Sequence, residues 1–97
     1  MLDENQIISL TGEEAVAALK EINFILISLH KIGAYYADKD PTEYAQETCR
    51  FLDEEKVTER LAKVREILSE KFDDRLGEDD MGDLERAMEE LRYWTPS

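Results

Sequence analysis

One stretch decides the fold: Thr11 to Ala37, TGEEAVAALKEINFILISLHKIGAYYA. Thr11 and Glu14 form a capping box, because the threonine hydroxyl can accept a hydrogen bond from the amide of Glu14 while the glutamate carboxylate reaches back to the amide of Thr11. Apolar residues then recur at alternating spacings of four and three, which places them on one helical face: Ala15, Leu19, Ile22, Leu26, Leu29, Gly33 and Tyr36. We therefore predict a helix over residues 11–37, central in a bundle because its middle is apolar nearly all round.

A turn and a second helix follow. Asp40 suits an N-cap, Pro41 suits the first helical position and Glu43 suits the reciprocal position of a second capping box, so the second helix is predicted over residues 41–72. Its early apolar residues, such as Phe51, are out of phase by about one residue with a later stripe, which comprises Val57, Leu61, Val64, Leu68 and Phe72. The helix therefore either bends near residue 53 or breaks there with Asp53 as the cap of a new helix, and a break is favoured.

The two ends of the chain complete the predicted fold. Residues 1–10 are expected to dock on the bundle as a short arm, either as a strand or as a short helix, and a last helix is expected over residues 80–94 after a loop with two glycines. Short turns between helices force antiparallel packing. The prediction is a single all-α domain over residues 1–97, an antiparallel bundle of three to four helices with a short N-terminal arm. Its expected core is Leu19, Ile22, Leu26, Leu29, Leu61, Val64, Leu68, Leu84 and Leu91.

Composition narrows the classes of partner. The 97 residues include 24 acids and 12 bases, a net charge of −12, and so negative a surface repels the phosphate backbone of nucleic acid and anionic membranes. Charged residues interrupt the most apolar stretch, so no membrane span is expected. The single Cys49 cannot form an internal disulfide, and the first residues are acidic where a secretory signal is basic, so a cytoplasmic location is expected. A basic protein is the partner that this charge favours.

Patterns for catalysis and metal binding are weak. His30, the only histidine, is expected to lie level with Cys49 across the helical hairpin, and a cysteine–histidine pair can be a nucleophile. A half-buried histidine beside a small buried thiol is the favoured interpretation, and slow alkylation of that thiol is expected. No metal and no cofactor are predicted, because Glu-x-x-His is absent and a calcium loop over residues 74–85 fails at its third and sixth positions. Loose divalent binding by acids of this loop stays open, and the chain is not expected to be an enzyme.

The most distinctive feature is an acidic run. Residues 73–90 hold nine acids and two bases. Six of these acids lie in and around the glycine-containing loop and are predicted to bind a basic partner: Asp73, Asp74, Glu78, Asp79, Asp80 and Asp83. Neutralising Asp79, Asp80 and Asp83 to asparagine should not unfold the chain, because these acids are expected to be solvated, and asparagine preserves a cap of the last helix at Asp79 or Asp80. The predicted function is a non-catalytic binding module, such as an inhibitor, immunity or antitoxin-type protein; the alternative is that the acids only keep the chain soluble.

Two aromatic residues lie away from the apolar stripe of the first helix. Phe24 and Tyr35 fall among the residues of its polar face. They are predicted to form a homodimer interface, unless another helix of the chain covers them. The alternative function is accordingly a homodimeric structural or regulatory helical protein.

Overall fold

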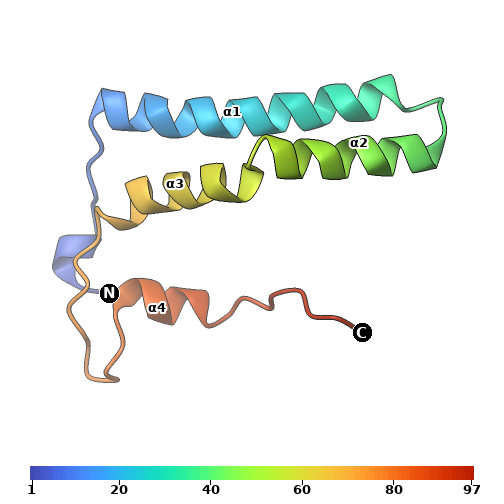
Figure 1. The fold of residues 1–97 in the computed structure, drawn as a ribbon. Coiled ribbons are helices and arrows are strands. Elements are labelled where there is room, and N and C mark those ends of the chain that lie inside the picture. The colour runs from blue at the N-terminus through green and yellow to red at the C-terminus, as the bar shows by residue number, and fades with distance from the viewer. The chain divides into compact units, whose positions relative to one another are not determined.

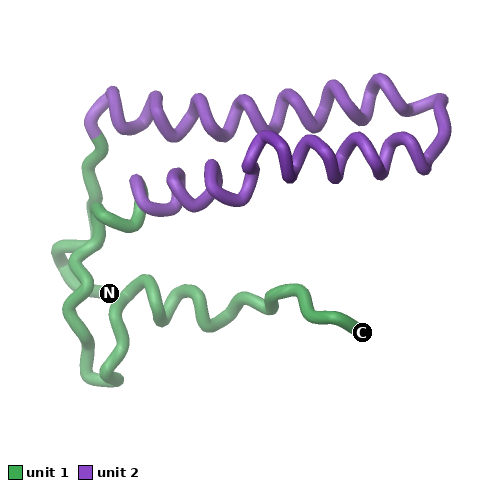
Figure 2. The backbone as a smooth tube through the Cα atoms, viewed as in Figure 1, with its two compact units in different colours: residues 1–10, 68–97 green, residues 11–67 purple.

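The computed structural model describes residues 1–97 and consists of helices and loops only, with 62% of residues helical. A 3₁₀ helix, η1, spans Asp3–Asn5, and four α-helices follow: α1 Gly12–Tyr35, α2 Pro41–Glu54, α3 Val57–Ser69 and α4 Asp83–Met88 (Figure 1). The all-α prediction is therefore confirmed. Where a single domain is expected from the sequence, the chain divides into two compact units (Figure 2): unit 1 comprises residues 1–10 and 68–97, and unit 2 comprises residues 11–67.

The first two α-helices start as their capping residues predict. The Thr11 hydroxyl accepts a hydrogen bond from the amide of Glu14 at 3.1 Å, and the Glu14 carboxylate accepts one from the amide of Thr11 at 2.9 Å. The Asp40 carboxylate accepts from the amide of Thr42 at 2.8 Å, with Pro41 as the first residue of α2. Both predicted N-caps are confirmed, but the prediction of a second capping box is wrong, because Glu43 does not bond back to the Asp40 amide. α1 nevertheless ends at residue 35, before the predicted end at 37.

The predicted second helix is broken in two. α2 and α3 are separated at Lys56, which adopts a left-handed backbone conformation with a φ of 53°. The favoured prediction of a break is confirmed, but Asp53 lies inside α2 and is not the cap of α3. On a continuous helix, residues 51 and 57 would point about 120° apart. With the break, Phe51 and Val57 both join Ile25 of α1 in one buried cluster, so the two apolar stripes face the same helix.

Unit 2 is a helical hairpin in which α1 runs antiparallel to α2, and α3 continues along α1 (Figure 1). Its buried apolar residues come from all three helices: Ala18, Ile25, Phe51, Val57 and Val64. Leu29 and Ile32 of α1 pack partly against this cluster.

The core lies on a face of α1 next to the predicted one. Val64 is buried as predicted, and Leu29 and Leu84 are partly buried, but the other predicted core residues are exposed: Leu19, Ile22, Leu26, Leu61, Leu68 and Leu91. Leu26 is 62% exposed. The prediction is wrong for Leu19, Ile22 and Leu26 because α1 is apolar nearly all round in its middle. Spacing alone cannot choose between Leu26 and its neighbour Ile25, which point about 100° apart.

Unit 1 consists mostly of loops. Residues 3–5 of the N-terminal arm form η1 rather than a strand, and α4 covers residues 83–88, which is shorter than the predicted 80–94. Gly82 is the N-cap of α4, so neither Asp79 nor Asp80 has the predicted capping role. None of the helices of either unit combines the length and the apolar character of a membrane span.

Candidate functional site

A buried carboxylate organises unit 1. Asp83 is only 7% exposed, and Asn5 beside it is 4% exposed. Oδ2 of Asp83 accepts from the Leu2 amide at 2.8 Å and from Nδ2 of Asn5 at 2.7 Å, while Oδ1 accepts from Nη1 of Arg86 at 2.9 Å. Nδ2 of Asn5 also donates to the carbonyl of Asp73 at 3.0 Å, and Oδ1 of Asn5 accepts from the amide of Asp73 at 2.7 Å. These hydrogen bonds fix the N-terminal arm to the loop that precedes α4.

Arg86 closes the acidic loop on itself. Its Nε and Nη2 donate to the two carboxylate oxygens of Asp79, each at 2.7 Å, and Nη2 also donates to the carbonyl of Met81 at 3.0 Å. Gly77 lies against this guanidinium, and a Cβ at that position would lie 2.8 Å from Nη2, so a larger residue would have to displace the end of the Arg86 side chain. Backbone hydrogen bonds close the same loop. The Gly77 amide donates to the Met81 carbonyl at 2.8 Å, and the Asp80 amide donates to the Gly77 carbonyl at 3.1 Å. Asp80 adopts a left-handed backbone conformation with a φ of 59°.

These partners lower the pKa of two loop carboxyl groups. The hydrogen bond from Asn5, followed by that from the Leu2 amide, lowers the pKa of Asp83 to about 2. The hydrogen bonds from Arg86 lower the pKa of Asp79 to about 2. Both groups therefore serve as structural anions, because their charge is already matched by donors of the same unit.

The six predicted partner-binding acids fall into two groups. Asp73, Asp79 and Asp83 are engaged within unit 1, Asp73 through Nε of Arg75 at 3.0 Å. The prediction of a solvated, replaceable side chain is therefore wrong for the buried Asp83. The side chains of the second group are exposed and take part in neither a hydrogen bond nor an ion pair: Asp74, Glu78 and Asp80. Three further acids of the run, outside the predicted set, share this property: Glu85, Glu89 and Glu90.

Two of the unpaired acids line a cavity of about 210 Å³ in unit 1, which we name the α4 hollow. Its apolar lining comes from Phe72, Leu76 and Leu84, and Asp74 and Glu85 contribute carboxylates to it. Such a cavity fits a lysine or arginine side chain, because the apolar stem can pack on the walls while the charged head pairs with a carboxylate.

His30 and Cys49 do not interact. Both side chains are exposed, and neither takes part in a hydrogen bond or an ion pair. The predicted half-burial of the histidine and burial of the thiol are therefore wrong, which removes the ground for expecting slow alkylation. No three side chains of His, Cys, Asp or Glu converge as metal ligands.

The two aromatic residues predicted at a dimer interface both have contacts within unit 2. The ring of Phe24 lies 5.8 Å from that of Phe51, and the Arg60 guanidinium lies 4.3 Å from the Phe24 ring centre. The Tyr35 ring meets that of Tyr36 edge-on at 4.8 Å, and the Lys39 ammonium lies 3.9 Å from the Tyr35 ring centre. Phe24 therefore lies on the side of α1 that meets α2, while Tyr35 stays largely exposed.

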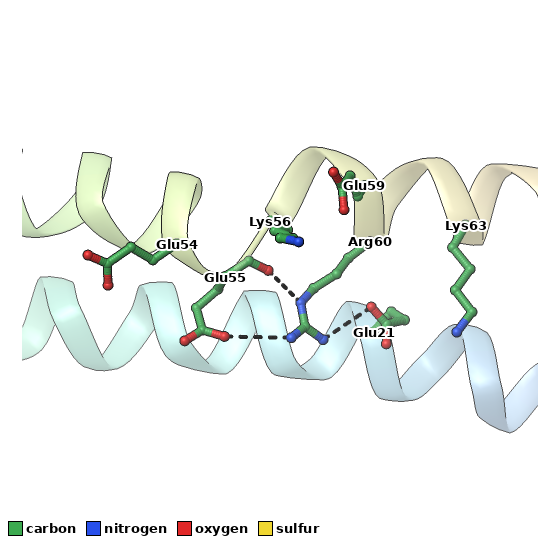
Figure 3. A pocket seen from close by; sticks show the side chains of 7 residues that line it. All are labelled: Glu21, Glu54, Glu55, Lys56, Glu59, Arg60 and Lys63. Atoms are coloured by element: carbon green, nitrogen blue, oxygen red, sulfur yellow. Dashed lines mark hydrogen bonds and ion pairs between the residues drawn. The ribbon is translucent and has the colours of Figure 1, made fainter.

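A larger hollow, of about 390 Å³, lies in unit 2 at the break between α2 and α3 (Figure 3). Arg60 reaches across it, with its guanidinium 3.4 Å from the carboxylate of Glu21 and 3.6 Å from that of Glu55. Its Nε also donates to the Glu55 carbonyl at 2.7 Å. Four acids and three bases line this hollow, so its charge is nearly balanced. The contacts of Arg60 tie α3 to α1.

Known proteins offer no guide to either hollow. No protein-family model matches the chain, and no curated protein or solved structure is detectably similar to it.

Proposed function

We propose that the chain is a non-catalytic protein-binding module that receives a basic side chain of its partner in the α4 hollow. The observation that carries this proposal is the meeting, in one cavity, of apolar walls with two carboxylates that no group of the chain neutralises. A carboxylate beside an apolar wall gains more from an arginine or lysine than a fully solvated acid does, because the partner's stem displaces water from the ion pair.

The charge around the α4 hollow supports the same proposal. Unit 1 carries twelve acids and four bases over 40 residues, a net of −8, whereas unit 2 carries twelve acids and eight bases over 57 residues, a net of −4. Arg75 and Arg86, the two bases of the acidic run, are both paired with acids of unit 1. The acids that remain exposed therefore produce a field that attracts cations and steers a basic partner towards unit 1.

Exposed apolar residues of unit 1 supply contact area for such a partner. Tyr93 and Trp94 are exposed, Trp94 at 86%, and so are Met88 and Leu91. Tryptophan and tyrosine are enriched among the residues that dominate binding energy at protein interfaces. The functional class that combines acidic recognition with a small non-catalytic domain is that of inhibitors, immunity proteins and antitoxins, which gain by presenting carboxylates where an enzyme holds phosphates.

Association kinetics with an oligoarginine peptide test the proposal. Asp74→Asn/Glu85→Gln removes the two unpaired carboxylates of the α4 hollow. Asp38→Asn/Asp53→Asn removes two exposed acids of unit 2 and serves as a control with the same net charge. We expect the hollow variant to bind roughly tenfold more slowly at low salt, while the control binds at nearly the wild-type rate. The difference should shrink as salt rises, since salt screens surface charges.

Equal rates for the two variants would mean that the peptide responds to net charge alone. The acids of unit 1 would then serve only to keep the chain soluble, which is the alternative function. Circular dichroism controls for folding, and both variants should match the wild type because none of the four replaced side chains has a partner within the chain.

A further inference from the structure

The outer face of α1 is exposed in unit 2. Five of its large apolar side chains are exposed: Val16, Leu19, Ile22, Leu26 and Ile27. One row of residues along this face is spaced alternately three and four apart, as is typical of paired helices. We name this row the α1 seam, and it comprises Val16, Leu19, Asn23, Leu26, His30 and Gly33. The hairpin does not use this row, because α1 meets α2 and α3 through the neighbouring face that carries Ala18 and Ile25.

Unit 2 does not cover its own apolar residues. No side chain of the chain is less than 2% exposed, and the buried apolar core comprises five residues. A hairpin supplies α1 with neighbours on one side only, whereas a helix that is apolar nearly all round is stable when it has neighbours on several sides. The seam is therefore a surface for another helix.

Charge favours a second copy of this chain as the occupant of the seam. The exposed charged residues of α1 are one acid and two bases, Glu13, Lys20 and Lys31, although the whole chain carries a net charge of −12. Two such acidic chains repel each other least where acids are scarce. A basic partner, by contrast, gains more at unit 1, where the unpaired acids lie.

We propose that two copies associate through their α1 seams with the helices antiparallel. This pairing places the following seam residues of the two copies opposite each other: Val16 with Gly33, Leu19 with His30, and Asn23 with Leu26. Each bulky side chain then meets a small or polar one, and the pairing is self-complementary, as a two-fold interface must be. The register is centred between residues 24 and 25, close to the middle of α1, so the helices overlap over nearly their whole length.

The helix ends favour this direction of pairing. Glu13 and Glu14 lie in the first turn of α1, whereas Lys31 lies towards its last turn. Antiparallel pairing brings the acidic first turn of one helix closer to Lys31 of the other and also opposes the two helix dipoles. Parallel pairing would instead place like charges and like ends together.

The size of the seam sets the expected affinity. A helix of 24 residues is about 36 Å long and about 10 Å across, so the seam covers roughly half of the ~800 Å² per partner that a standard interface buries. We therefore expect a reversible association in the micromolar range.

Sedimentation of the full chain over a wide concentration range is the first test. The wild type should shift from monomer to dimer, and Leu26→Glu should raise the dissociation constant roughly 100-fold or more, because it places a charge without a partner in the seam. The variant should keep its helical circular dichroism, since Leu26 is exposed in the single chain. Tyr35→Ser is the control, because Tyr35 lies off the seam, and it should dimerise like the wild type. A wild type that stays monomeric, or a dimer that Leu26→Glu leaves intact, would overturn the proposal.

Cross-linking through engineered cysteines tests the direction of pairing. Cys49 is exposed, so the variants carry Cys49→Ala to prevent its own oxidation. Val16→Cys and Gly33→Cys are then made in separate chains, and Gly33 has open space for a side chain. Mild oxidation should cross-link a mixture of the two variants and leave Val16→Cys alone largely monomeric. Cross-linking of Val16→Cys with itself would contradict the antiparallel pairing, and no cross-link in either sample would contradict the seam.

Discussion

Unit 2 is held together by apolar side chains, whereas unit 1 is held together by charged and amide groups. In unit 2, Ile25, Phe51 and Val57 form the buried cluster between α1 and the two helices that pack on it. In unit 1 the buried residues are both polar, Asn5 and Asp83. Apolar burial depends little on pH and ionic strength, but a carboxylate that is hydrogen-bonded in the folded state loses its contribution when it is protonated. The two units of one small chain should therefore respond differently to mutation and to acid.

The largest effect is expected from the apolar cluster of unit 2. Phe51→Ala removes a buried ring that also packs against Phe24, and should lower the free energy of unfolding by about 3–5 kcal/mol. The neighbouring Leu52 is exposed, so Leu52→Ala should cost less than about 1 kcal/mol. Urea unfolding followed by circular dichroism measures both values. Similar losses for the two variants would mean that the cluster does not hold the hairpin.

A somewhat smaller effect is expected from the polar contacts of unit 1. Asn5→Ala removes three hydrogen bonds and leaves the buried Asp83 with one donor fewer, which should cost roughly 3 kcal/mol locally. Hydrogen exchange at the amides of Leu2 and Asp73 reports the loss, since both amides donate within this network. Gln6→Ala changes the adjacent exposed amide and serves as the control. If the exchange rates of the Leu2 and Asp73 amides stay at their wild-type values in Asn5→Ala, Asn5 does not fix the arm.

Acid should loosen unit 1 before unit 2. The pKa values of Asp79 and Asp83 are about 2 in the folded unit, against an ordinary value of 3.8. Because the folded pKa is depressed, both carboxylates stabilise unit 1 fully above pH 3.8, and this contribution is lost as the pH falls from there towards 2. Exchange of the Gly77 and Asp80 amides should therefore quicken in this range while the amide of Ile25 stays protected. Loss of protection at Ile25 first would reverse the comparison between the units.

The fold was predictable from the sequence where both partners of an interaction lie close together in the chain. The capping pairs Thr11–Glu14 and Asp40–Thr42 are separated by three and two residues, and both form. The core face of α1 was not predictable, because its apolar residues lie nearly all round the helix and their spacing does not indicate which face the neighbouring helices cover. Leu26 was assigned to the core in place of Ile25 for that reason.

The candidate site was predictable only in part. The six acids predicted to bind a partner include Asp74, which lines the α4 hollow, but not Glu85, which belongs to the same acidic run and lies on the short helix α4. The burial of Asp83 has no local signal, since Leu2 and Asn5, which bond to its Oδ2, lie 81 and 78 residues away in the chain and only Arg86 is a near neighbour. Periodicity and capping rules report on neighbours within one or two helical turns, so a carboxylate held by a distant arm looks the same in sequence as a solvated one.

The most direct test of the proposed function is an NMR titration of the full chain with the oligoarginine peptide, followed through the backbone amide signals. The largest shifts should occur at the α4 hollow, at the amides of Asp74, Leu84 and Glu85, and Asp74→Asn/Glu85→Gln should remove them. Amides of the charge-balanced hollow around Arg60 should hardly move. Shifts centred on Arg60, or spread evenly over the exposed acids of both units, would contradict the assignment of the α4 hollow as the binding site.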